Sequence, residues 1–200
     1  MIRPYAPADL AALRRVCLLT ARAGTDATGQ YSDDDLLPDI FVEAYVTLEP
    51  DLAWTVEIDG RPVGFAVSTM DTRELARRWP VEFGPVFAER HPRELQQPGE
   101  EWLFDWGETA EGMVHDIADE FPAHFHIDLL PEAQGKGFGR ALLRQVGLAA
   151  VASRAPGVHL AMDPENAPAL AFYQRLGFRE LGLDDGALVL GIASEALAGA

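Results

Sequence analysis

The segment from residue 134 to residue 140, QGKGFGR, has the residue types of an anion-binding loop. Glycines allow a backbone to approach a ligand closely, and a helix that begins here would present free N–H groups and the positive end of its dipole. Lys136 and Arg140 add positive charge to a chain whose net charge is −16. We therefore expect this segment to hold a pyrophosphate group.

Two other kinds of phosphate-binding loop are excluded by the same residues. A Rossmann dinucleotide loop needs a glycine where Arg140 stands, and it normally follows an early strand. A P-loop needs Gly-Lys-Ser or Gly-Lys-Thr after its glycines, and the chain contains neither sequence.

The glycine segment lies where an expected strand ends and an expected helix begins. Period-two and helical patterns alternate through the second half of the chain. They predict strands at 123–130, 157–163, 178–184 and 186–193, and helices at 137–155 and 166–177. Neighbouring strands joined through a helix must run parallel, because only a crossover returns the chain to the same end. We expect an α/β fold, a mixed sheet with helices on both faces.

The first half of the chain supplies the rest of this sheet. A β-hairpin is predicted at 52–68 because two β-rich runs meet at Asp59-Gly60. Before it we expect a short strand at 2–4, helices at 7–23 and 40–48, and a polar loop at 24–35. After it, the prolines between Met70 and Phe121 indicate an insertion with helical fragments such as TRELARRW and TAEGMVHDIADE.

Two motifs carry a family resemblance. Gln134-x-x-Gly137-x-Gly139 resembles the Gln/Arg-x-x-Gly-x-Gly/Ala signature of the GNAT acetyltransferase superfamily. The run from Asn166-Ala167 through Phe172-Tyr173 to Leu176-Gly177-Phe178 is similar to the next motif of that family, in the family's order and spacing. More narrowly, FPAHFHIDLLPEAQGKGFGRALL and VHLAMDPENAPALAFYQRLGF resemble bacterial relatives of the acetyltransferase-like C-terminal domain of O-GlcNAcase.

The resemblance implies a single GNAT domain over residues 1–200, with an insertion at about 70–121 between strands 3 and 4. Its sheet would have six to seven strands, with strands 4 and 5 parallel and splayed to admit acetyl-CoA. The backbone at the end of strand 4 would pair with the pantetheine arm, and an N–H near Leu129 would polarise the acetyl carbonyl. The residues implied to bind the cofactor are Ile127, Asp128, Leu129, Gln134, Gly135, Lys136, Gly137, Phe138, Gly139, Arg140, Asn166 and Tyr173.

The candidate catalytic residues are Tyr173, which the resemblance implies, and Asp128, which lies at the cleft end of strand 4. Tyr173 matches the tyrosine that protonates the departing CoA thiolate; cofactor contact without proton transfer and simple packing remain open. The acceptor amine must lose a proton before it can attack, so a base is needed. Some family members place a glutamate on strand 5, where this chain has Ala161. Asp128 is the replacement candidate, either as a base, in orienting the substrate, or in a structural hydrogen bond.

His124, His126 and Asp128 share one strand face, because side chains two apart point the same way. We do not predict a metal there, since no further ligand follows from spacing and the family needs none. Cys17, the only cysteine, excludes an internal disulfide and lies at core spacing with neighbouring leucines. We expect the Cys17 thiol to be packed in the core. We also expect the protein to be cytoplasmic, where the environment is reducing.

These residues indicate an acetyl-CoA-dependent N-acetyltransferase in which an amine attacks directly in a ternary complex. The alternative is a non-catalytic acetyl-CoA or CoA sensor or scaffold, which the lack of an acid at Ala161 favours and the full glycine loop disfavours. The acceptor, small molecule or protein, and an acyl group longer than acetyl remain open.

The remaining expectations concern partners. An acidic chain should repel nucleic acid and anionic membranes, no apolar run is long enough to span a bilayer, and the N-terminus lacks the apolar stretch of a secretory signal. Trp79, Trp102, Phe104 and Trp106 lie in the insertion. They either anchor it to the domain or form an acceptor-binding wall or a homodimer contact.

Overall fold

Seven strands form one mixed sheet in the computed structural model, which describes residues 1 to 200. The strand order across the sheet is β1-β2-β3-β4-β5-β7-β6. The strands are β1 (Ile2–Pro4), β2 (Ala53–Ile58), β3 (Arg61–Thr69), β4 (Ala123–Leu129), β5 (Gly157–Met162), β6 (Arg179–Asp184) and β7 (Ala187–Ala193). The α/β sheet expected from the sequence is confirmed.

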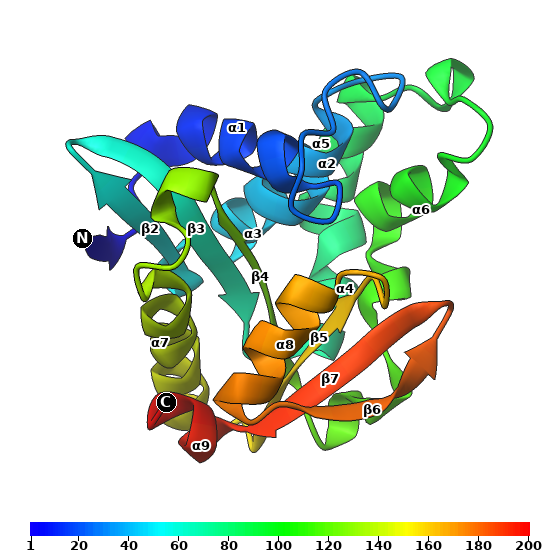
Figure 1. Ribbon diagram of the computed structural model, residues 1–200. Coiled ribbons are helices and arrows are strands. Elements are labelled where there is room, and N and C mark those ends of the chain that lie inside the picture. Colours follow the sequence, from blue (N-terminus) through cyan, green and yellow to red (C-terminus); the bar gives the residue numbers. More distant parts are fainter.

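The sheet opens between β4 and β5, its only parallel neighbours. Their register contains two pairs, Ala123 with Val158 and His124 with His159. Beyond His124 the strands diverge, and the two halves of the sheet separate from that end (Figure 1). The predicted splaying of strands 4 and 5 is therefore present, and it leaves the last five residues of β4 without a partner on one side.

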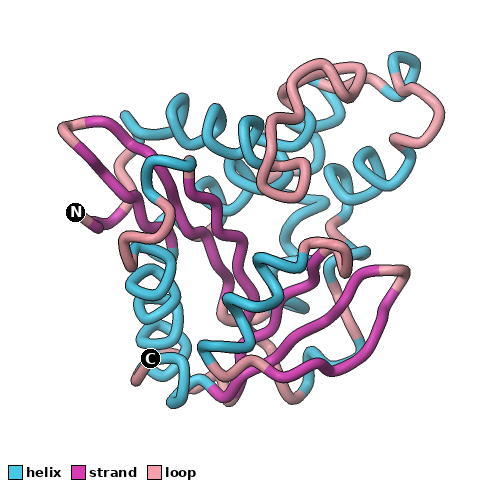
Figure 2. The backbone as a smooth tube through the Cα atoms, in the orientation of Figure 1, coloured by secondary structure: helices cyan, strands magenta, loops and turns pink.

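Helices cover both faces of the sheet, as the backbone tube makes visible (Figure 2). On one face α7 (Phe138–Ala152) packs on β1, β3, β4 and β5, and α9 (Ser194–Ala198) packs on α7 and β7. The helix α8 (Ala167–Leu176) contributes to the apolar core of this same face. On the other face α1 (Leu10–Thr20) packs on β3 and β4, and α3 (Ala44–Leu48) packs on β3.

The helix expected at 40–48 begins earlier. It starts as α2 (Leu36–Pro38), continues through a π-helical turn (Asp39–Glu43) and ends as α3. The first helix is α1, preceded by a 3₁₀ turn at Pro7–Asp9. Cys17 is buried in the core of this region, as expected.

The insertion between β3 and β4 is more regular than its prolines suggest. It contains α4 (Thr72–Glu82), α5 (Gly84–Arg90), α6 (Glu101–Thr109) and 3₁₀ turns at Arg93–Leu95, Glu111–Met113 and Asp116–Asp119. The helix α4 continues through Pro80, and Arg78 bonds Glu82 across that turn. The helix expected over TAEGMVHDIADE is wrong, because Ala110 adopts a left-handed φ of 56° that ends α6.

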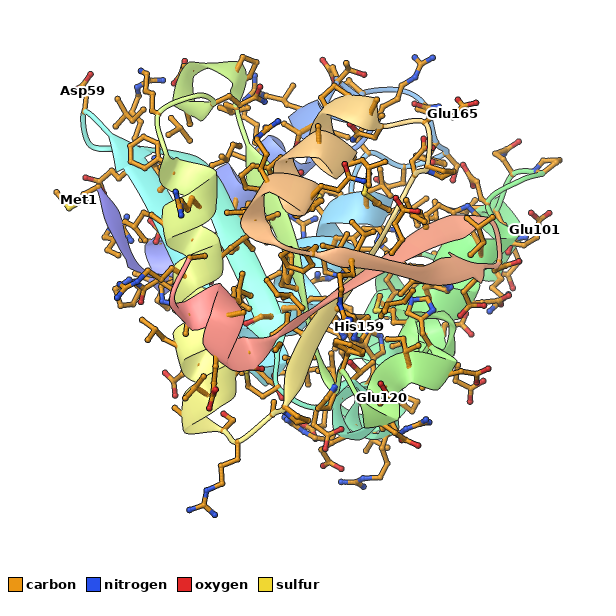
Figure 3. All side chains as sticks on the ribbon, turned by 60° about the horizontal axis from the view of Figure 1, so that its bottom comes forward. Met1, Asp59, Glu101, Glu120, His159 and Glu165 are labelled. Atoms are coloured by element: carbon orange, nitrogen blue, oxygen red, sulfur yellow. The ribbon has the colours of Figure 1, made fainter.

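The predicted hairpin is confirmed as β2 and β3. Asp59 and Gly60 both have positive φ, 51° and 75°, as a two-residue turn of the twist-matching kind requires. Asp59 lies at the outer tip of this hairpin, and Glu165 lies on the loop that enters α8 (Figure 3). None of the helices has the length and apolar character needed to cross a membrane.

Candidate active site

The gap in the sheet is lined by the free edge of β4. Its residues 125 to 129 pair with β3 on one side and with no strand on the other. Beyond its two pairs with β4, β5 pairs with β7. The backbone groups on the open edge of β4 can therefore pair with an extended ligand in the manner of an added strand. Ile127, Asp128 and Leu129 lie on this edge and are partly buried.

The glycine loop lies at the end of this edge. Gly135 and Gly137 have φ of 71° and 81°, a left-handed backbone that glycine adopts without strain. No protein atom lies within 4 Å of a Cβ built at either position, so the loop surface is open. The backbone N–H groups of residues 135 to 140 donate no hydrogen bond within the protein. The loop thus offers a row of free donors at the start of α7.

Charged and polar side chains frame this loop. Lys136 and Arg140 are exposed and form no ion pair, so both are free to meet an anion. Gln134 is exposed, and its amide Nε2 donates to the Leu129 carbonyl at 2.9 Å. That bond ties the loop to the end of β4. Phe138, the first residue of α7, is partly buried against the neighbouring apolar core.

Gly139 sets how closely α8 approaches α7. A Cβ at this position would come within 3.0 Å of the Phe172 ring and 3.6 Å of Leu129. A larger residue would push Phe172 away, so glycine here allows the two helices to close on either side of the gap. This close approach is one reason for a glycine at position 139.

Tyr173 lies on α8, on the α7 side of the sheet. Its ring is 8% exposed and packs against Phe125 and Phe178. Its hydroxyl makes no hydrogen bond in the protein and is not among the buried unpaired atoms, so it keeps some accessible surface. Burial first, and the charge of Asp128 second, raise the pKa of Tyr173, which therefore stays protonated at neutral pH.

Asn166 begins the same helix. Its side-chain oxygen accepts the N–H of Ala169 at 3.2 Å, as an N-cap residue does. The remaining amide N–H groups are free to contact a ligand. Ala161, where some relatives have a carboxylate, is an exposed residue near the end of β5.

Asp128 lies on the opposite face of the sheet from Tyr173, toward α1. Burial raises the pKa of the Asp128 carboxyl to about 6, while the neighbouring Thr20 hydroxyl acts in the opposite direction. No arginine or lysine forms an ion pair with it. At pH 7 Asp128 is thus mostly ionised, and a pKa close to neutral pH suits a group that accepts a proton.

His124 and His126 share this face with Asp128, as predicted, and they contact a residue that the sequence analysis did not identify. The hydroxyl of Tyr45 lies 2.5 Å from His124 Nε2 and 2.9 Å from His126 Nε2. Tyr45 is fully buried on α3, and 79 residues separate it from His124. No sequence pattern relates positions this far apart. No group of three His, Cys, Asp or Glu side chains is arranged to bind a metal ion.

The four aromatic residues of the insertion divide into two pairs. Trp79 and Phe104 are buried in one core with Tyr45, whose ring lies 5.8 Å from that of Trp79, so this pair anchors the insertion to the domain. Trp102 is 39% exposed and lies 5.2 Å from Trp106, ring to ring. Both tryptophans contact Phe41, which in turn lies 5.0 Å from the His126 ring. We call Phe41, Trp102 and Trp106 the aromatic cluster.

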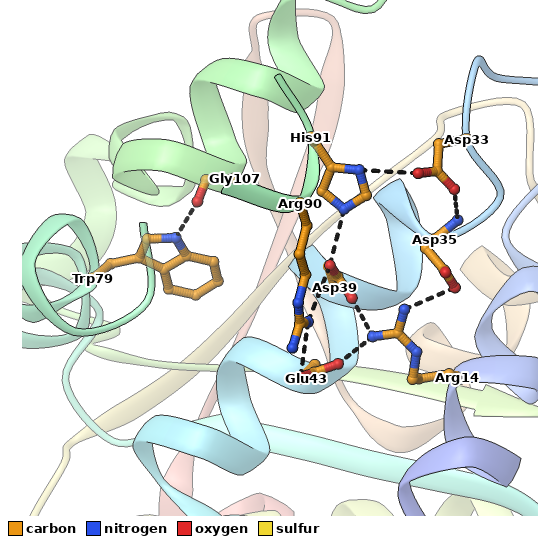
Figure 4. A network of polar contacts seen from close by, with 9 residues as sticks. All are labelled: Arg14, Asp33, Asp35, Asp39, Glu43, Trp79, Arg90, His91 and Gly107. Atoms are coloured by element: carbon orange, nitrogen blue, oxygen red, sulfur yellow. Dashed lines mark hydrogen bonds and ion pairs between the residues drawn. The ribbon is translucent and has the colours of Figure 1, made fainter. Parts of the chain in front are cut away.

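A separate polar network joins α1, the π-helical turn and the end of α5 (Figure 4). Asp39 has no exposed surface and accepts from Arg14, Arg90 and His91. Glu43 bonds the same two arginines. Hydrogen bonds from His91 and Arg14 hold the pKa of Asp39 below its usual value although burial opposes them. These residues line a hollow of about 640 Å³, but their charges are satisfied by one another.

Comparison with known proteins agrees with this geometry. A family model described as "Acetyltransferase (GNAT) domain" matches residues 101–180. The crystal structure of SsHAT is 36% identical, with a TM-score of 0.91, covering 97% of this chain and 98% of that one. A PaiA N-acetyltransferase from Thermoplasma acidophilum, solved in complex with coenzyme A, shares the fold at 15% identity with a TM-score of 0.56, covering 96% of this chain and 98% of that one.

One curated relative is a much longer protein. The protein O-GlcNAcase of Rattus norvegicus is 22% identical over 190 residues, which are 92% of this chain and 20% of that protein. This chain therefore spans about a fifth of the length of that relative. The sheet gap, the glycine loop, the family match and the full-length similarity to SsHAT together place the chain in the GNAT acetyltransferase family.

Proposed function

We propose that this protein is an acetyl-CoA-dependent N-acetyltransferase that transfers the acetyl group directly to an amine. The observation that carries the proposal is the gap between β4 and β5, which leads from the free edge of β4 to the open glycine loop. Tyr173 belongs to the core on the α7 side of the sheet, and Asp128 lies on the α1 side beside Thr20. Such an arrangement suits a thioester held in the gap with a proton donor and a proton acceptor on opposite faces.

The cofactor-binding roles follow from the free backbone groups. The N–H groups of residues 135 to 140, with Lys136 and Arg140, would bind the pyrophosphate. The edge formed by Ile127, Asp128 and Leu129 would pair with the pantetheine arm. When bound, acetyl-CoA supplies the thioester whose acetyl group is transferred. Asn166 would contact the pantetheine side with its free amide N–H.

The acceptor nitrogen loses one proton before it attacks and a second proton as the amide forms, and the leaving sulfur gains one proton. Asp128 is ionised at neutral pH and accepts a proton from the acceptor ammonium, which frees the nitrogen lone pair for attack on the acetyl carbonyl. An N–H near Leu129 polarises that carbonyl. As the C–S bond breaks, Tyr173 donates its proton to the leaving sulfur. Its raised pKa keeps this proton in place until the sulfur is charged.

The acceptor would enter from the α1 face. Asp128 lies there, on the same strand face as His126, whose ring contacts Phe41 of the aromatic cluster. Aromatic rings with a carboxylate suit an amine that arrives as a cation. The acidic net charge of −16 would also favour such an acceptor. With a single thiol, the protein is suited to act in a reducing cytoplasm.

A thiol-release assay with acetyl-CoA and a panel of amines tests this function, with mass spectrometry of the products. The panel should contain a polyamine, an amino sugar, a lysine peptide and a peptide with a free N-terminus. We expect thiol release that depends on one class of amine, together with the matching acetamide. Acetyl-CoA binding without any amide product would instead support the sensor or scaffold, in line with the missing acid at Ala161.

A further inference from the structure

A chain of hydrogen bonds runs from the insertion to the gap. Thr72 Oγ1 lies 2.7 Å from the Pro122 carbonyl oxygen and 2.6 Å from His124 Nδ1. On the other side of that ring, His124 Nε2 lies 2.5 Å from the Tyr45 hydroxyl. The same hydroxyl lies 2.9 Å from His126 Nε2. Four side chains on three elements thus form one continuous row.

The distances assign the proton on each ring. The Thr72 hydroxyl has one hydrogen, and its contact with the Pro122 carbonyl requires that hydrogen, because a carbonyl oxygen can only accept. Thr72 must then accept from His124, which places a proton on His124 Nδ1 and leaves Nε2 as an acceptor. Burial lowers the pKa of His124, so this ring does not carry a second proton.

The assignment continues through Tyr45. Its hydroxyl has one hydrogen and two candidate acceptors, His124 Nε2 at 2.5 Å and the weakly accepting Met113 Sδ at 3.2 Å. The shorter contact with the stronger acceptor takes the hydrogen, so the Tyr45 oxygen accepts from His126 Nε2. His126 then carries its proton on Nε2 and a lone pair on Nδ1. Burial lowers the pKa of His126 to about 4, which keeps the ring neutral at pH 7.

His126 lies where the gap begins, and its Nδ1 is free. It has no partner in the protein and is not among the buried unpaired atoms, so it reaches accessible space. Parallel pairing ends at His124, and His126 is the next residue on that strand face, followed by Asp128. The charged and titratable groups around it are Tyr45 on α3, His124 and Asp128 on β4, and His159 on β5.

We propose that Thr72, His124 and Tyr45 act as positioning residues that hold His126 in its Nε2–H form, so that His126 Nδ1 accepts a proton from the attacking nitrogen. This inference rests on the proposed function and adds a second proton acceptor to it. An ammonium acceptor loses two protons on becoming an amide. Asp128 takes the first before the attack, and His126 takes the second as the N–C bond forms and the C–S bond breaks. Tyr173 protonates the sulfur, and solvent restores Tyr173, His126 and Asp128 after release.

The first test determines which nitrogen of each histidine ring carries the proton, and it does not depend on enzyme activity. The chain has 5 histidines, so ¹⁵N-histidine labelling with two-bond ¹H–¹⁵N correlation can resolve each ring, with His126→Gln and His124→Gln used for assignment. We expect the proton on Nδ1 in His124 and on Nε2 in His126. In Tyr45→Phe, His126 should become a mixture of both forms. A wild-type His126 ring with its proton on Nδ1 would overturn the proposal, whether or not the protein turns out to be an enzyme.

The second test separates catalysis from structure. In His126→Gln, the amide nitrogen can replace Nε2 and keep the bond to Tyr45, but nothing replaces Nδ1. We expect kcat to fall about a hundredfold, with KM for acetyl-CoA and the melting temperature nearly unchanged. Tyr45→Phe should lower kcat less, about tenfold, because the His126 ring remains but its proton is no longer fixed on Nε2. A His126→Gln variant with the kcat of the wild type would show that His126 only supports Tyr45.

Discussion

Asp39 and Asp128 are aspartates on the same side of the sheet, and their surroundings give them opposite properties. Asp39 is fully buried, but Arg14, Arg90 and His91 bond it and hold its pKa below the usual value. Asp128 is only partly buried, has no cationic partner, and has its pKa raised to about 6. Charge compensation, more than depth, decides which carboxylate remains available for proton transfer.

The comparison also separates stability from function. The Asp39 network links α1, the π-helical turn and the insertion through ion pairs. Because its charges neutralise one another, no group in it is left to bind a substrate. At neutral pH Asp128 is ionised although its burial disfavours the charged form, and this lowers the stability of the folded protein. An uncompensated carboxylate of this kind is common at active sites. Each of the following predictions tests one side of this contrast.

The largest expected effect is on stability, at Asp39. Asp39→Asn leaves the two arginines without their buried counter-charge, so we expect the free energy of unfolding to fall by about 3–5 kcal/mol. Urea denaturation measures this change. Asp35→Asn is the control, because Asp35 pairs with the same Arg14 but is 63% exposed, and its loss should cost less than about 1 kcal/mol. Equal losses in the two variants would show that burial of the network is unimportant.

Asp128→Asn should lower activity rather than stability. We expect kcat/KM to fall by about a hundredfold or more, because the base is lost, while the free energy of unfolding stays the same or rises. Steady-state kinetics and urea denaturation on the same preparation measure both. A variant that loses stability but keeps its activity would assign Asp128 the structural role.

Tyr173→Phe should have a smaller effect, on the departure of the thiol. The ring and its packing against Phe125 and Phe178 are kept, so the melting temperature should change little. We expect kcat to fall about ten- to a hundredfold, with little change in the affinity for acetyl-CoA. Unchanged kcat would reduce Tyr173 to a packing residue. Weakened binding with unchanged kcat would make it a cofactor contact.

The smallest expected effect is the pH dependence of stability. A raised pKa means that folded Asp128 binds its proton more tightly than the unfolded chain, so this group adds stability as the pH falls from about 6 toward 4. We expect about 1–2 kcal/mol over this window, and none of it in Asp128→Asn. Asp39 acts in the other direction, since its stabilisation is lost only below its ordinary pKa. Parallel curves for wild type and Asp128→Asn would contradict the raised pKa.

The sequence predicts the second half of this molecule well because its signals are local. Alternation, helical periodicity and the glycine motif place β4, α7, β5 and α8 to within a few residues. The resemblance to a known family supplies the parallel, splayed pair that local patterns alone do not specify. The insertion is predicted less well, since α5, α6 and the end of α6 at Ala110 depend on packing rather than on periodicity.

The parts of the site that the sequence does not predict depend on long-range contacts. Tyr45 reaches His126 from 81 residues away, and Asp39 meets Arg90 from 51 residues away. Neither pair has a spacing that any regular element produces. The sequence does place His124, His126 and Asp128 on one face, but only the fold shows that Tyr45 connects the two histidines.

The central claim is that acetyl-CoA binds in the gap with its pyrophosphate on the glycine loop, and calorimetric titration of acetyl-CoA tests it most directly. Gly137→Glu places a carboxylate among the free N–H groups, and Gly186→Glu is a matched control in the β6–β7 turn. The two glycines have φ of 81° and 84° with no atom near their Cβ positions, so both variants carry the same backbone strain. We predict that binding is lost in Gly137→Glu and retained in Gly186→Glu. Equal affinity in both variants, or no binding by the wild type, would contradict the account.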